Sequence, residues 1–346
     1  MPKHSLFILA AFLGLTASLS LASPARSEPL TIGHLSWSAP PAVTGEISGL
    51  AKTSKKKRSS KMPMRVSSAT VAKPRYQAWM SPEIIGAWNA GYRGQRATIT
   101  VVDDFTSGRR LSGDLGTGSQ PLRHGEWTRL KGSMLAPSSM LASHDYSTGR
   151  RVTLSRTGLN VANLSYGMFA RSGTRASQIA WSAQESSLIG FAKKGSAVIA
   201  KAAGNDGVAV GAGTRSGNTD FLNVTLVGTP STIFVGALDR NGTRKQKARL
   251  ASYSNFAGKN PAVQRQFLTV GVHGDLSNLY GTSFAAPVVS GYAAVLGSKF
   301  TSASPSQISR RLLDTARTDT IQNYKASVHG RGQASISRAL APSRIN

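Results

Sequence analysis

Residues 97–104 read ATITVVDD, so that six apolar or β-branched residues are followed directly by two aspartates. Such a run predicts a strand that is buried on both faces of a parallel sheet, with polar groups at its carboxyl end. Further strands are predicted at residues 161–166, 197–203 and 232–238.

Helical patterns separate these strands. Their predicted ranges are residues 81–88, 179–194 (closed by Gly195), 284–296 and 304–315. Strands that alternate with helices imply right-handed crossovers between parallel strands. The sequence therefore predicts an α/β fold, with a doubly wound, mostly parallel sheet and helices on both faces. In such sheets, sites form at the carboxyl ends of the strands.

The first 75 residues differ from this pattern. A basic start, an apolar run over residues 6–21 and small residues up to Ala22 and Ala25 predict a cleaved export signal over residues 1–22. Residues 23–75 are rich in Ser, Pro, Ala and Lys with weak periodicity, and we interpret them as a flexible basic linker or pro-segment. A folded domain is expected over residues 76–346, in an exported protein, periplasmic or extracellular, whose mature form has no transmembrane span.

Composition narrows the chemistry further. The chain has no cysteine, which excludes disulfides, thiol nucleophiles and zinc-thiolate sites. It carries 42 Lys and Arg against 15 Asp and Glu, a net charge of +27. Such a protein can adhere nonspecifically to polysaccharide, nucleic acid or lipid headgroups. No signature of specific nucleic-acid recognition is present.

The sharpest motif is GTSFAAPVVSG, residues 281–291. Gly281 permits a tight turn, and Ser283 stands where a loop enters a helix of small residues. Unpaired backbone N–H groups at such a helix start favour a developing anion. Spacing alone leaves open whether Ser283 is a nucleophile or an ordinary helix N-cap.

This motif closely resembles the nucleophile motif of the subtilisin family of serine peptidases, in which the serine attacks the peptide carbonyl. The segment AWNAGYRGQRATITVVDDF, residues 87–105, resembles the family's segment leading to the catalytic aspartate. The resemblance maps that aspartate to Asp103, although Asp104 stands where the family has a small residue. Because side chains alternate along a strand, one of the two faces the site.

The histidine segment departs from the family pattern. His124-Gly125 retains the first pair of an HGTHVAG-like string, but the residues that follow do not match. His144 lies in the same interval without the glycine, so His124 is the predicted general base. The alternative is a surface histidine in a polar loop.

Two further segments resemble family motifs in the same chain order. Residues 202–205, AAGN, resemble the oxyanion-hole segment, with Asn205 as the donor. Residues 163–167, NLSYG, resemble the strand that pairs with substrate. The substrate-binding residues that the resemblance implies are Ser165, Tyr166, Gly167, Ala203 and Gly204. Without the resemblance, these segments read as a turn and a strand end.

The resemblance implies a secreted endopeptidase that hydrolyses polypeptides through a Ser-His-Asp triad and needs no cofactor. The short interval between Asp103 and His124 and the scarcity of acidic residues predict that no metal is required. Two other readings remain. One is the related sedolisin type, with Glu126 as a candidate acidic base. The other is an inactive relative that acts as a cationic binding protein.

Overall fold

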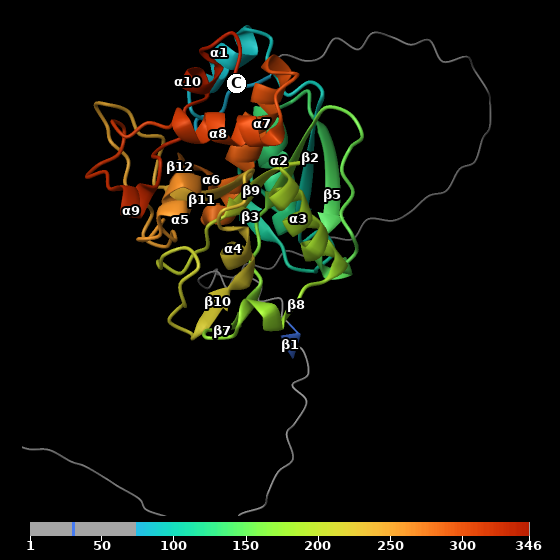
Figure 1. Cartoon of the computed structure of the whole chain (residues 1–346). Helices are drawn as coiled ribbons and strands as arrows, with labels where there is room; N and C mark the ends of the chain where they lie inside the picture. The colour runs from blue at the N-terminus through green and yellow to red at the C-terminus, as the bar shows by residue number, and fades with distance from the viewer. Residues whose placement is uncertain (1–29, 32–73, 346) are drawn as a thin grey trace, which may run out of the picture.

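The computed structural model describes residues 30–31 and 74–345, and a six-stranded parallel sheet forms its centre (Figure 1). From one edge to the other, the strands are β12 (Phe267–Gly271), β11 (Thr232–Leu238), β9 (Val198–Ala202), β6 (Leu159–Leu164), β2 (Ala97–Asp103) and β5 (Met140–Asp145). The residues of the four central strands are all buried. This confirms the predicted α/β fold, and it explains why those strands read as continuous apolar runs.

Helices cover both faces of the sheet (Figure 1). One apolar core contains side chains from α1 (Glu83–Asn89), α2 (His124–Leu135), α7 (Ala286–Lys299), α8 (Pro305–Asp314) and α10 (Ile336–Leu340). The core on the other face contains side chains from α3 (Ala183–Lys194), α4 (Phe221–Leu226) and α5 (Pro261–Gln266). Two short helices, α6 (Gly274–Ser277) and α9 (Ala326–His329), lie in the loops.

Three pairs of short strands complete the described part. They are β3 (Leu111–Gly113) with β4 (Gln120–Leu122), β7 (Phe169–Arg171) with β10 (Asn218–Asp220), and β1 (Leu30–Thr31) with β8 (Ile179–Ala180). The predicted signal segment 1–22 and almost all of the basic segment 23–75 lie outside the described residues, so those predictions stay untested.

Several elements differ from the predictions or were not predicted, among them the buried strand β12, and three cases have a local reason. Helix α3 begins at Ala183 instead of residue 179, because the Ser182 hydroxyl caps it by accepting from the N–H of Gln184 at 3.1 Å. The strand β5 was not predicted, since it is an edge strand with a largely exposed, mixed sequence. The segment expected to begin a helix at residue 284 instead forms a 3-10 turn, Thr282–Phe284, ahead of α7.

Helix α7 is buried from Ala286 to Gly297, which is why its sequence is small and apolar on every side. Close packing of this helix under the sheet holds its N-terminal turn at the carboxyl edge of the strands. No helix among the described residues is long and apolar enough to cross a membrane.

Candidate active site

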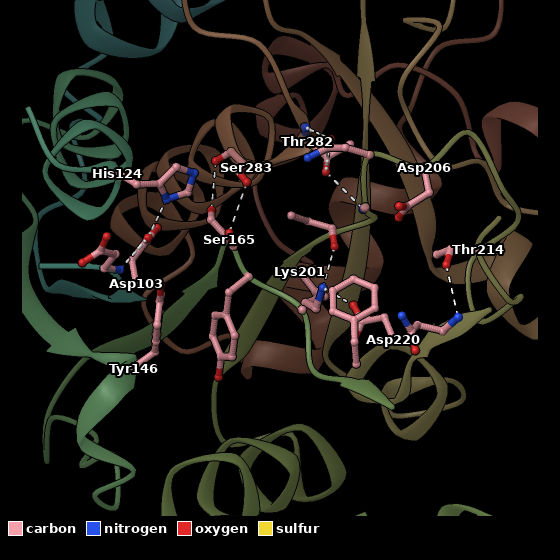
Figure 2. Close-up of a pocket in the computed structure, with 18 of the residues that line it drawn as sticks. Asp103, His124, Tyr146, Ser165, Lys201, Asp206, Thr214, Asp220, Thr282 and Ser283 are labelled. Carbon is pink, nitrogen blue, oxygen red and sulfur yellow. Dashed lines mark hydrogen bonds and ion pairs between the residues drawn. The ribbon is translucent and has the colours of Figure 1, made fainter. Parts of the chain in front are cut away.

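A pocket of about 470 Å³ opens at the carboxyl edge of the sheet (Figure 2). It lies where the winding of the sheet reverses, because β5 and β6 flank β2 on opposite sides. The predicted site residues that line it are Asp103, His124, Ser165, Tyr166, Gly167, Gly204, Asn205 and Ser283. The topology therefore gathers segments that are 180 residues apart in the chain.

Asp103 and His124 form a hydrogen-bonded pair in this pocket. Asp103 is the last residue of β2 and is fully buried, and its Oδ1 lies 2.5 Å from Nδ1 of His124 at the start of α2. The other carboxylate oxygen accepts from the Thr128 hydroxyl at 2.9 Å. A carboxylate is acceptor-only, so Nδ1 carries the proton and Nε2 is left as the basic nitrogen.

Asp104 turns away from the histidine. Its carboxylate accepts from the N–H of Ser107 at 2.9 Å and from the Ser107 hydroxyl. Of the two consecutive aspartates, Asp103 is thus the one that contacts His124, as the alternation of side chains along a strand requires. His144 is not among the residues that line the pocket.

The environment of His124 favours its protonated form. Burial acts to lower the pKa of His124, but the charge of Asp103, its hydrogen bond and the charge of Asp104 together raise that pKa above the ordinary value. The side chain keeps 18% of its surface exposed, so the ring still reaches the open pocket. It also lies against the ring of Phe284, with 5.4 Å between centroids.

Ser283 is held in the 3-10 turn beside His124 (Figure 2). Its hydroxyl donates to the carbonyl of Ser165 at 3.1 Å, and the Ser165 hydroxyl donates to the carbonyl of Ser283 at 2.9 Å. In the described residues it makes no hydrogen bond to His124. Rotation about one side-chain bond is needed to direct the hydroxyl toward the imidazole, and catalytic hydrogen bonds are often long before substrate binds.

Asn205 is oriented by the turn that carries the serine. Its Oδ1 accepts from the N–H of Thr282 at 2.7 Å and from the Thr282 hydroxyl at 3.0 Å. The Nδ2 group has no protein partner in the described part of the chain, and neither has the N–H of Ser283. Two donors are therefore available at the nucleophile, which is the composition of an oxyanion hole.

Two glycines are required by close approach. Gly204 has φ 113°, and a Cβ there would lie 2.2 Å from Nδ2 of Asn255. A Cβ on Gly167 would meet the Phe169 ring at 2.5 Å. Because neither position has room for a side chain, the pocket is lined there by backbone, which a ligand can approach closely.

Ala203 is placed differently from the expectation. It is fully buried, and its carbonyl accepts from the side-chain amides of Asn223 and Asn255, each at 3.0 Å. Ala202 lines the pocket in its place. Ala203 follows the end of β9, and its side chain packs in the core that contains α4.

Sequence reasoning missed two features of the site. Thr128, one helical turn after His124, orients Asp103. Lys201 and Asp220 form a buried ion pair of 3.0 Å at the pocket lining. A lysine within the apolar run AVIAKAA, residues 197–203, was a visible signal of the second feature.

Glu126 lies outside the pocket lining. It accepts from the N–H of Arg123 at 2.7 Å and forms an ion pair with the Arg123 guanidinium, so it works at the start of α2 and not beside Ser283. In residues 30–31 and 74–345, no group of three or more acidic or histidine side chains is arranged to hold a metal ion.

The model of the subtilase family matches residues 130–333, more than half of the chain. The chain belongs to the subtilase family. The matched part of this subtilase contains Asn205 and Ser283, whereas Asp103 and His124 precede it. Asp103 and His124 are placed in the site by their contact within the pocket and not by the family match.

Solved structures similar to this subtilase are proteases. MycP1 of the ESX-1 type VII secretion system has 20% sequence identity and a TM-score of 0.48, over 78% of this chain and 88% of that chain. A protease from Pseudoalteromonas arctica has 17% identity and a TM-score of 0.46, over 78% and 96%. A cold adapted subtilisin-like serine proteinase has 18% identity and a TM-score of 0.42, over 70% and 88%. No curated protein matches this subtilase.

Proposed function

We propose that this subtilase is an exported serine endopeptidase in which Ser283, His124 and Asp103 act as a triad. The observation that carries the proposal is the 2.5 Å contact between Asp103 and His124 in the pocket that also holds Ser283 and Asn205. These groups come from separate elements, β2, α2, the turn before α7 and the end of β9. A buried carboxylate, an imidazole and a serine in one pocket fit acyl transfer better than a purely structural role.

The proposed reaction has two balanced halves. The Ser283 oxygen attacks the peptide carbonyl while its proton passes to Nε2 of His124, and Asp103 holds the imidazolium that forms. The Asn205 amide and the Ser283 N–H bind the oxyanion. Collapse releases the amine, which takes the proton from His124 and leaves an acyl-serine. Water then hydrolyses this ester, giving its proton to His124, which returns it to the serine oxygen.

Export is supported by the N-terminal sequence: the basic start, the apolar run over residues 6–21 and the small residues that follow. We place the peptidase outside the cytoplasm on this ground, with polypeptides as its substrates. Its excess of 27 positive charges would also hold it on anionic surfaces at low salt.

A serine-directed fluorophosphonate tests the catalytic part. We expect it to label the folded protein at Ser283, to fail with Ser283→Ala, and to react at least 100-fold more slowly with His124→Ala. Ser186→Ala, at an exposed serine of α3, is the matched control and should label normally. Folded protein that is never labelled would contradict the proposal and favour an inactive, cationic binding protein.

A further inference from the structure

A buried ion pair lies at the far side of the pocket from the nucleophile. Lys201, in β9, and Asp220, at the end of β10, are 3.0 Å apart and almost fully buried, and both line the pocket. Figure 2 shows the pair on one side of the pocket and Asp103 with His124 on the other. The walls between them are the segment after β6 and the segment after β9.

Lys201 is out of place as a core residue. The other residues of β9 are apolar. A buried ion pair is often no more stabilising than well-packed apolar side chains of similar volume at the same positions. The pair is therefore poorly explained as a stabilising device. Its place on the pocket lining suggests that it meets a ligand instead.

The hydrogen bonds of the pair leave one donor unused. Oδ1 of Asp220 accepts from the N–H groups of Met168, Leu222 and Asn223 at 2.9, 3.1 and 3.4 Å, and its Oδ2 accepts from Lys201. The Lys201 ammonium has three hydrogens, and two are bound by Asp220 and by the carbonyl of Ala202 at 2.7 Å. In the described residues the third has no acceptor, so the pair offers the pocket a donor.

The same pocket also holds a further carboxylate. Asp206, which directly follows Asn205, lines the same pocket (Figure 2). Burial and the charge of Asp220 both raise the pKa of Asp206. This end of the pocket thus presents an ammonium donor and a carboxylate acceptor.

We propose that the Lys201–Asp220 pair, with Asp206, makes this end of the pocket a subsite for a carboxamide side chain, glutamine or asparagine, on the residue whose carbonyl Ser283 attacks. The amide oxygen accepts the unused hydrogen of Lys201, and the amide NH₂ donates to Asp206. This inference rests on the proposed peptidase function and names its substrate class.

The other side-chain classes fit less well. An apolar side chain desolvates the Asp206 carboxylate and the third hydrogen of Lys201 without offering either of them a hydrogen bond. A basic side chain brings a second cation against Lys201, and it has no acceptor for the unused hydrogen of that ammonium. An acidic side chain meets Lys201 but is repelled by Asp206 and Asp220. The carboxamide alone carries both a donor and an acceptor without net charge.

Peptides that differ only at this substrate residue test the inference on the full-length protein. The set is Gln, Asn, Leu, Met, Phe, Glu and Lys, and kcat/KM is measured by mass spectrometry. We expect Gln or Asn to be cleaved at least ~10-fold better than Leu, because a site built to hydrogen-bond a substrate group discriminates against analogues that lack it.

The double variant Lys201→Met with Asp220→Asn removes both charges and keeps an oxygen at position 220 for the three backbone donors. We expect it to lose the Gln-over-Leu preference, measured as the ratio of kcat/KM for the two peptides with the same variant. Lys131→Met, at a buried lysine that does not line the pocket, is the matched control and should keep the preference. If the double variant does not fold, the peptide series on the unmodified protein decides the matter.

Preferred cleavage after Leu, Phe, Glu or Lys overturns this inference, as does a double variant that keeps the Gln preference. In those cases labelling and cleavage still occur, so the proposed peptidase function stands. Absence of both labelling and cleavage in folded protein overturns the peptidase function and this inference together.

Discussion

The contact between His124 and Asp103 shows how much of the site depends on single atoms. Three donors converge on the Asp103 carboxylate, from His124, the Thr128 hydroxyl and the N–H of Asp104 at 2.7 Å. A buried carboxylate held in this way fixes the ring orientation of the histidine. Thr128 is therefore a positioning residue that acts through Asp103.

The raised pKa of His124 predicts the acid limb of activity. The general base must be neutral, so we expect kcat/KM to fall as the pH drops through a pKa above the ordinary value of 6.5. Asp103→Asn removes the charge that raises this pKa. It should move the limb to lower pH and reduce kcat about 10⁴-fold.

A pH profile of kcat/KM with a good peptide substrate is the measurement. Asp104→Asn is the matched control, because the charge of Asp104 raises the pKa of His124 less than the charge of Asp103 does. It should keep most of the activity and shift the limb only slightly. An acid limb below pH 6.5 in the parent protein would contradict the prediction.

At the scale of elements, α2 and α7 pack together under the sheet. Helix α2 begins at His124, and α7 begins shortly after the turn that carries Ser283. Their packing contains a buried lysine. The side chain of Lys131 in α2 lies 4.8 Å from the centre of the Trp79 ring, and its ammonium donates to the carbonyl of Val272 at 3.4 Å. One weak hydrogen bond and a ring face do not replace the hydration of an ammonium.

Burial lowers the pKa of Lys131 to about 7, which predicts a pH-dependent stability. The unfolded chain binds the proton more tightly, so this group contributes a free energy of unfolding that rises between about pH 7 and pH 10.5. Below pH 7 its burial costs up to roughly 5 kcal/mol. We expect Lys131→Met to stabilise the fold by a few kcal/mol at neutral pH, and by less near pH 10.

Urea unfolding of the parent and of Lys131→Met at pH 6, 8 and 10 measures this effect. Lys193→Met, at an exposed lysine of α3, is the control and should change the free energy of unfolding little at any pH. A Lys131→Met variant that is less stable than the parent by the same amount at all three pH values would contradict the prediction, because it would show that burial does not lower the pKa of Lys131.

At the scale of the whole molecule, the chain joins a compact α/β domain to a long basic N-terminal segment. An exported peptidase with such a segment calls for two separate processing events. Signal peptidase would cut near Ala22 or Ala25, whereas removal of the segment up to residue 75 would need a further protease, and the enzyme itself is the simplest candidate.

Mass spectrometry of the exported protein separates these events. We expect both the parent and Ser283→Ala to lose the residues that precede 23 or 26, because the first cut does not depend on Ser283. Loss of residues up to about 75 should occur in the parent alone if the enzyme removes its own segment. Leu13→Arg, which interrupts the apolar run, is the control that should block export.

Exported protein that still begins at Met1 would contradict the prediction of a cleaved export signal. A segment removed equally in the parent and in Ser283→Ala would assign its removal to another protease.

The sequence by itself determined what local patterns can carry. Apolar, β-branched runs specify buried strands, and small residues from 286 onward specify a buried helix, because burial acts on each residue through its own side chain. The GTS, AAGN and VVDD motifs indicated the serine, the asparagine and the aspartate pair through their resemblance to the subtilisin family. These motifs also led to the family.

Only the tertiary structure decided which groups meet. It placed Asp103 instead of Asp104 against His124, and it put Ala202 instead of Ala203 on the pocket wall. It also joined Lys201 to Asp220, which are 19 residues apart. Such contacts depend on strand register, on the rotation of each strand and on loop paths. Those are properties of the packed sheet as a whole, and no local stretch of sequence encodes them.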